Sequence, residues 1–154
     1  MIFLNKISLV LATCFGLGYL IPIGQGTLGA FFALFFIPVF IQISLSGKII
    51  LILSAVFLGI FIAGLAEKVL RTKDDHRIII DEFISIFITF VCVGSKVTFF
   101  VLIVGFFLNR IFDWIKPYPA GKLQNLRGGW GIIADDIVSG AMAGLVLLVF
   151  GFFS

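Results

Sequence analysis

The sequence predicts an all-α protein, a polytopic membrane helical bundle with about four to five transmembrane helices and a re-entrant or broken N-terminal segment. Hydrophobic residues make up 61% of the 154 residues and charged residues 12%, whereas a soluble domain is about half apolar and about a quarter charged. The apolar residues also form several runs near the roughly 20 residues that a helix needs to cross a bilayer. We therefore expect residues 1–154 to form a single integral-membrane domain.

The first apolar segment, residues 7–23, is short for a membrane span and is interrupted by Gly16, Gly18 and Pro22. The residues that follow it, 21–30, read IPIGQGTLGA and predict irregular backbone. A bilayer tolerates such backbone only inside protein or beside water. We expect a re-entrant or half-crossing segment that stays in the mature protein, because no Ala-x-Ala-like cleavage site follows it.

The rest of the chain alternates long apolar runs with short polar stretches. A tight turn is expected at residues 46–48, and the long run 78–108 is expected to divide near residues 94–96. The expected spans are residues 28–45 with a kink at Pro38, residues 49–66, two spans within 78–108, and residues 137–153.

The basic residues gather in two loops, residues 67–77 and 109–128. The positive-inside rule places these loops and the N-terminus in the cytoplasm. All eight acidic residues then fall on the same face, whereas a transporter is expected to place ionisable groups near the midplane. The net charge of +3 is small and spread over loops, so we expect a membrane partner and no nucleic acid.

The densest polar stretch is residues 109–136. Asn109, Asp113 and Lys116 project from one side of an expected helix, which Pro117 ends. Arg110 lies beside Asp113. An ordinary helix-end ion pair between Asp113 and one of these cations is the alternative to a functional role.

Asp135 and Asp136 stand just before the expected last helix, where acids in a first turn would suit the helix dipole. Adjacent carboxylates near apolar surroundings repel each other, however, and need a cation. The small residues Gly140, Ala143 and Gly144 allow other helices to approach closely, so Asp136 is expected to point into the bundle.

Asp81 and Glu82 lie within a few residues of an apolar run, where an unpaired ionisable group costs at least about 2–3 kcal/mol. Ser85 is expected to add a hydroxyl on the same face as Asp81. Magnesium suits a set of carboxylates that also leaves room for water and phosphate oxygens. The expected ligands of Mg²⁺, which are also the expected catalytic residues, are Asp81, Glu82, Asp113, Asp135 and Asp136.

Cationic side chains near these acids are natural partners of a phosphate group. Arg110, Lys116 and Arg127 fit this role, and the backbone N–H groups around Gly26 and Thr27 are expected to form an anion-binding nest.

Three further polar or aromatic residues receive other interpretations. Glu67 is as well explained by pairing with Arg71 as by a place in the site. The single histidine, His76, is expected to be solvated, and Trp114 is expected to anchor the chain at the membrane interface.

Three blocks of the sequence resemble the phosphatidylglycerophosphatase A family. Residues 22–30, PIGQGTLGA, are similar to a Pro-x-Ala-Pro-Gly-Thr-x-Gly-Ser motif, and residues 74–82, DDHRIIIDE, to Asp-x-x-x-Ile-Val-x-Asp-Glu. Residues 110–119 and 128–140 match the family's last block almost position for position. The sequence departs from the family pattern at Gln25, Ala30 and Ser85.

The resemblance implies a magnesium-dependent enzyme of the bacterial inner membrane that removes the terminal phosphate of phosphatidylglycerol phosphate. The basic loops, and not the resemblance, place the expected substrate site at the cytoplasmic face. Attack by water and formation of an aspartyl phosphate both remain open, as do the oligomeric state and the number of metal ions.

Other interpretations also remain. The chain could act on another lipid or isoprenoid phosphate. From a different class, it could be a small ion-coupled transporter or a lipid-binding scaffold. The acidic residues could also do no more than tie loops together.

Overall fold

The computed structural model describes residues 2–94 and 97–150, and the regular structure in this part of the chain is entirely helical. The all-α prediction is therefore confirmed for these residues. The elements are α1 (Ile2–Ala12), a 3-10 helix η1 (Leu17–Tyr19), α2 (Gln25–Leu34), α3 (Ile37–Phe40), α4 (Leu45–Leu70), α5 (Ile80–Thr89), α6 (Phe99–Ile115), α7 (Ala120–Leu123) and α8 (Gly129–Val149).

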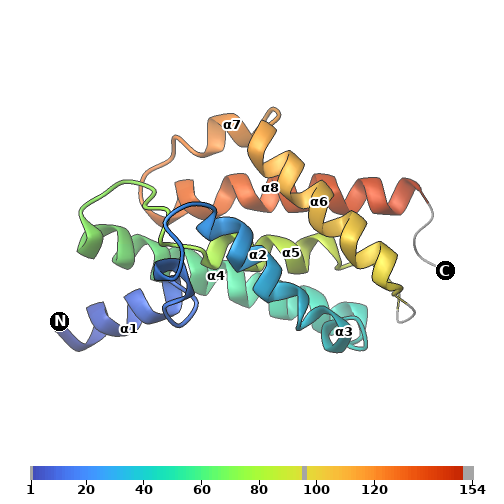
Figure 1. Ribbon diagram of the computed structural model, residues 1–154, viewed down its shortest axis with the longest axis horizontal. Coiled ribbons are helices and arrows are strands. Elements are labelled where there is room, and N and C mark those ends of the chain that lie inside the picture. The colour runs from blue at the N-terminus through green and yellow to red at the C-terminus, as the bar shows by residue number, and fades with distance from the viewer. Residues whose placement is uncertain (1, 95–96, 151–154) are drawn as a thin grey trace.

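The two longest helices, α4 and α8, run along the length of the molecule, and α6 crosses α8 (Figure 1). The short helix α5 packs against α2, α4, α6 and α8 and so occupies the centre of the bundle. With 26 and 21 residues, α4 and α8 are about 39 and 31 Å long. Among the described helices these two are long and apolar enough to cross a membrane, so the count of four to five spans stays a prediction.

The outer surface of α4 is strongly apolar. Leu53, Phe57 and Phe61 are 63%, 75% and 62% exposed. Large side chains with this exposure are costly in water, whereas hydrocarbon accommodates them. The surface of α4 therefore supports a membrane environment for the chain.

The N-terminal half differs from expectation in two places. Residues 25–30 are not irregular but form the start of α2. Glycine at positions 26 and 29 lets this helix pack closely, because a side chain at either position would collide with a neighbour. The single helix expected over residues 28–45 is wrong, since the chain breaks between α2 and α3. That this segment crosses the membrane stays a prediction. Pro38 lies in the first turn of α3, where its missing N–H leaves no helical hydrogen bond unmade.

The expected turn at residues 46–48 is also wrong, because these residues lie inside α4. Ser44 caps the helix by accepting a hydrogen bond from Gly47 N at 3.3 Å. Lys48 is buried and donates to the carbonyl oxygen of Val93 at 2.9 Å, across the bundle. The helix continues to Leu70 and ends at Arg71 in the left-handed conformation, so Glu67 is helical rather than in a loop.

The last helix begins earlier than expected, at Gly129 rather than near residue 137. A side chain at Gly129 would collide with the carbonyl group of Ile60, so glycine allows α8 to start in close contact with α4. Asp135 and Asp136 consequently lie beyond the first turn of α8. The interpretation of these two aspartates as caps of the helix N-terminus is wrong.

Candidate functional site

The loop over residues 71–79 is held in place where it enters α5. Arg77 donates from Nε and Nη2 to the two carboxylate oxygens of Asp75, both at 2.7 Å. These hydrogen bonds hold the pKa of Asp75 below its ordinary value, although burial of the carboxyl opposes them. The anchored loop fixes the first turn of α5, which carries Asp81 and Glu82.

A cavity of about 290 Å³ lies at this end of the bundle, and we call it the carboxylate cavity. It collects acidic side chains from α5, α6, α8 and the loop over residues 71–79. The predicted convergence of the five acidic residues is thus found in the structure. The lining residues are Asp74, His76, Ile78, Asp81, Glu82, Asp113, Trp114, Lys116, Asp135 and Asp136.

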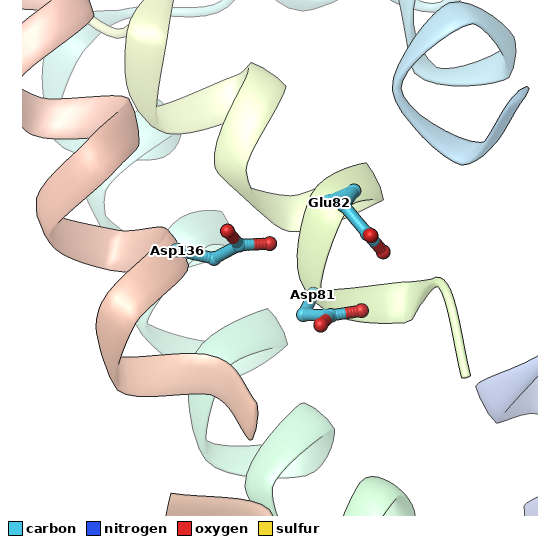
Figure 2. A group of neighbouring side chains, drawn as sticks. All are labelled: Asp81, Glu82 and Asp136. Carbon is cyan, nitrogen blue, oxygen red and sulfur yellow. The ribbon is translucent and has the colours of Figure 1, made fainter. Parts of the chain in front are cut away.

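The carboxylates approach one another closely enough to share a metal ion. Asp81, Glu82 and Asp136 each offer an oxygen within 4.8 Å of the others, and so do Asp113, Asp135 and Asp136. Figure 2 shows Asp136 extending from α8 toward the first turn of α5, from which Asp81 and Glu82 project. Asp136 belongs to both groups and therefore lies at the centre of the arrangement.

Ion pairs account for only part of this negative charge. Lys116 Nζ lies 2.6 Å from Asp135 Oδ2, and Arg110 Nη2 lies 3.0 Å from Asp113 Oδ2. The second pair is the helix-end salt bridge considered as an alternative for Asp113. Among the described residues, no such cationic partner is found for Asp81, Glu82 or Asp136.

Four oxygens of these three carboxylates also lack a hydrogen-bond donor among the residues that the structure describes. Both oxygens of Asp136, Oδ1 of Asp81 and Oε2 of Glu82 are buried without a hydrogen-bond partner. Buried carboxylate oxygens are costly unless a donor or a cation meets them. A divalent cation with oxygen ligands fits this donor set, and the interpretation of the acids as loop ties does not explain it.

A buried network of hydrogen bonds joins α5, α6 and α8 next to the carboxylate cavity. Ser85 Oγ donates to the backbone oxygen of Asp136 at 2.8 Å and accepts from Asn109 Nδ2 at 2.7 Å. Asn109 also donates to Thr89 Oγ1 at 3.0 Å. The Ser85 hydroxyl, expected to face the site, instead connects α5 with α6 and α8, and the sequence did not reveal this role of Asn109.

The small-residue face of α8 has the expected effect. A side chain at Gly140 would come within 2.6 Å of the carbonyl oxygen of Ser85, and Ala143 is fully buried. Because α5 and α8 approach so closely, Asp136 is 3% exposed and points into the bundle, as predicted.

The expected phosphate-binding residues are divided among different places. Lys116 lines the carboxylate cavity, at the left-handed residue that ends α6. Arg110 and Thr27 line a neighbouring cavity of about 270 Å³, which we call the intermediate cavity and which shares Asp113 and Trp114 with the carboxylate cavity.

Residues 25–27 form the first turn of α2, whose backbone N–H groups have no acceptor within the helix, so anion binding by these groups stays a prediction. Gly26 gives α2 its close contact with the site. A side chain at this position would collide with the Glu82 carboxylate and reach within 3.3 Å of Arg110 Nη1.

Arg127 lies in a separate open pocket of about 520 Å³. The same pocket is lined by Glu67, and the other lining residues are Lys68, Arg71, Thr72, Lys73, Asn125 and Gly128. Glu67 accepts a hydrogen bond from Asp74 N at 3.3 Å, so it supports the loop next to the carboxylate cavity. The structure therefore brings neither Arg127 nor Glu67 into the lining of that cavity.

Besides Ile78, three lining residues were not expected at the site. Asp74 and His76 are exposed residues of the loop, and Trp114 is 89% exposed near the end of α6. For Asp74, the sequence did offer an indication, because all eight acidic residues were predicted to lie on the same face of the membrane. No sequence signal placed His76 or Trp114 beside the carboxylates.

Comparison with known proteins gives one family. The family model described as phosphatidylglycerophosphatase A matches residues 10–151. The phosphatidylglycerophosphatase A of Escherichia coli is 31% identical over 145 residues, which cover 92% of this chain and 82% of that protein. The Haemophilus influenzae protein of the same name is 32% identical over 152 residues, which cover 94% of this chain and 91% of that protein.

A protein of Bacteroides thetaiotaomicron, provisionally named phosphatidylinositol-3-phosphatase, is 29% identical over 93% of this chain and 92% of its own length. No solved structure matches. The family model spans nearly the whole chain, including every residue of the carboxylate cavity. The chain belongs to the phosphatidylglycerophosphatase A family.

Proposed function

We propose that this chain is a magnesium-dependent membrane phosphatase that hydrolyses phosphatidylglycerol phosphate to phosphatidylglycerol and inorganic phosphate. The observation that carries the proposal is the group formed by Asp81, Glu82 and Asp136. These residues are close together, largely buried and, within the described part of the chain, without cationic partners. The names of two relatives supply the substrate.

The residues that would hold Mg²⁺ are Asp81, Glu82, Asp113, Asp135 and Asp136. When bound, the ion would neutralise phosphate oxygens and stabilise charge on the leaving oxygen. Not all of these carboxylates need to act as ligands at once. One that faces the cavity without a cation is suited to accept a proton from water.

Lys116 is the cation best placed for the terminal phosphate. The ion pair with Asp135 holds the ammonium group of Lys116 at the wall of the carboxylate cavity. Arg110 binds phosphate oxygens from the adjoining intermediate cavity. In the reaction, the oxygen of a water molecule forms a bond to phosphorus. The bond between phosphorus and the oxygen of the glycerol head group breaks, and the leaving alkoxide takes a proton.

The phosphoryl group passes either directly to water or first to an aspartate. Acid quenching during turnover separates these routes, since only the second leaves phosphate covalently attached to the protein.

The proposed location is the bacterial inner membrane, with several crossings and the carboxylate cavity at the cytoplasmic face. One observation, together with a general rule, supports this orientation. Lys68, Arg71, Lys73 and Arg127 line the pocket beside the cavity. Basic residues near the ends of spans favour the cytoplasmic side.

A second substrate class has specific support. One relative is named for a phosphatase of phosphatidylinositol 3-phosphate. That lipid shares with phosphatidylglycerol phosphate a phosphomonoester on a head group joined to glycerol through a phosphodiester. The carboxylate cavity suits the phosphomonoester in both cases.

The test is phosphate release from both lipids in mixed micelles, with Mg²⁺ and with chelator. We expect release from phosphatidylglycerol phosphate that requires Mg²⁺ and is slower from the inositol lipid. Faster release from the inositol lipid would favour the second substrate class.

A matched pair of variants assigns the activity to the site. Glu82→Gln is expected to lower kcat by about 100-fold, because a group that supports the reacting charge is lost. Glu67→Gln makes the same chemical change outside the carboxylate cavity and should retain activity. Equal activity of both variants, or full turnover in chelator, contradicts the proposal.

A further inference from the structure

An apolar groove of about 540 Å³ runs between α2–α3 and α6. Phe31 and Pro38 line one side, and Phe99, Ile103 and Phe107 line the other. The two sides run antiparallel, since Pro38 shares the groove with Phe99, while α2 and the end of α6 meet at the intermediate cavity. The rings of Phe31 and Phe106 make an edge contact at 6.4 Å across this interface.

The groove continues into the proposed active site. Phe107 lines both the groove and the intermediate cavity, where Thr27 and Arg110 are found. Asp113 and Trp114 line both the intermediate and the carboxylate cavities. Three spaces therefore follow one another along α6, the first apolar, the second cationic and hydroxyl-bearing, and the third acidic.

We propose that the groove holds one acyl chain of the lipid substrate, an inference that rests on the proposed function. A phospholipid with a terminal phosphate has its parts in the same order as these spaces. The acyl chain lies in the groove, the phosphodiester lies at Thr27 and Arg110, and the terminal phosphate lies in the carboxylate cavity. The substrate thus enters sideways from the bilayer between α2 and α6.

Two observations favour a lipid over a helix of another protein. The Nε atom of Arg110 is buried without a hydrogen-bond partner where the groove meets the polar cavities, so an anion is expected there. Along α6, the helical path from Phe99 in the groove to Arg110 in the intermediate cavity is about 16 Å long, a length that suits an extended chain. A packed helix would cover the apolar groove but would leave Arg110 without a phosphate.

The groove contributes to the reaction by orienting the bound lipid. An acyl chain that leaves the bilayer for an apolar groove gains little hydrophobic free energy. Its contribution is to fix the head group relative to the carboxylates, and the loss of such positioning slows a reaction.

The test uses Ile103→Trp, which fills the groove, and Ile50→Trp, which makes the same change on the exposed surface of α4. Both are assayed with long-chain phosphatidylglycerol phosphate and with its deacylated, water-soluble head group. We expect Ile103→Trp to lower kcat/KM for the lipid by about tenfold and to leave the head group unaffected. Ile50→Trp should change neither.

A second measurement does not depend on turnover. The wild-type protein is photolabelled with phosphatidylglycerol phosphate that carries a diazirine in the middle of an acyl chain. Labels on residues 99–107, suppressed by unlabelled lipid, support the inference. Labels spread over the outer surface of α4, with no suppression, overturn it.

The remaining outcomes are also decisive. Equal loss with lipid and head group in Ile103→Trp, or no loss with either, overturns the groove assignment while the phosphatase proposal stands. Absence of phosphate release from both compounds in the folded wild-type protein overturns the proposed function, and the inference with it.

Discussion

Gly26 of α2 lies against Glu82, which lines the carboxylate cavity. The position that a Gly26 side chain would occupy is already taken by the Glu82 carboxylate. Glycine at this residue therefore lets α2 press against a proposed metal ligand and against Arg110.

We expect Gly26→Ala to push the Glu82 carboxylate out of the group that it forms with Asp81 and Asp136. The predicted result is a loss of at least about tenfold in kcat with the fold retained, because small displacements of catalytic groups are costly. Phosphate release and circular dichroism measure the two quantities.

Gly64→Ala is the control, since Gly64 is also a helical glycine but its added methyl group meets Gly129 N at 3.1 Å and does not meet a carboxylate. A Gly26→Ala enzyme as active as Gly64→Ala would show that Glu82 needs no fixed position.

At the scale of residues, the sequence correctly predicted that the acidic side chains lie close together. Asp81, Glu82 and Asp136 lie beside apolar runs, where an unpaired charge is costly, and this cost indicated a shared partner. The positions of Asp74, His76 and Arg127 depend on the paths of irregular loops. Those paths follow from tertiary packing, such as the Arg77–Asp75 anchor, and no periodic pattern reports them.

At the scale of elements, the position of α5 relative to α8 determines the site. Ser85 joins the two helices through its hydrogen bond to the Asp136 backbone, and Gly140 leaves the space that this contact requires. The distance between α5 and α8 sets the distance between Asp81 and Asp136.

We expect Gly140→Ala to force these helices apart and to lower stability by about 1–3 kcal/mol, the usual cost of overpacking a core. Activity should fall as well, because the carboxylates of the two helices separate. Thermal unfolding in detergent and phosphate release test both effects.

Gly144→Ala on the same face is the comparison. Its added methyl group meets the Thr89 carbonyl oxygen at 3.0 Å, whereas the one at Gly140 meets the Ser85 carbonyl oxygen at 2.6 Å. The Gly144 variant should therefore be the milder one, and the reverse order would contradict the role given to the α5–α8 contact.

Element boundaries were predicted less well than element type. Apolar runs indicated helices correctly, but α8 begins at Gly129 because that glycine fits against the carbonyl group of Ile60. The break between α2 and α3 is likewise absent from the hydropathy pattern, because residues 31–37 are uniformly apolar.

At the scale of the whole molecule, one end of an otherwise apolar bundle gathers the polar groups. The structure joins Asp81 and Glu82 of α5 with Asp113 of α6 and with Asp135 and Asp136 of α8. The sequence predicted this convergence because hydrophobic spans and basic loops placed all these acids on one side. The expected count of four to five membrane spans stays a prediction, because it depends on how α2, α3, α5 and α6 sit in the bilayer.

The central claim is that these separated segments share a divalent cation, and Mn²⁺ binding followed by electron paramagnetic resonance tests it most directly. We expect the purified wild-type protein to bind Mn²⁺ in competition with Mg²⁺. Asp136→Asn, which removes a ligand from both carboxylate groups, should weaken binding by about 10–100-fold. Glu67→Gln should bind as the wild type does. Unchanged Mn²⁺ affinity in a folded Asp136→Asn protein would contradict the account.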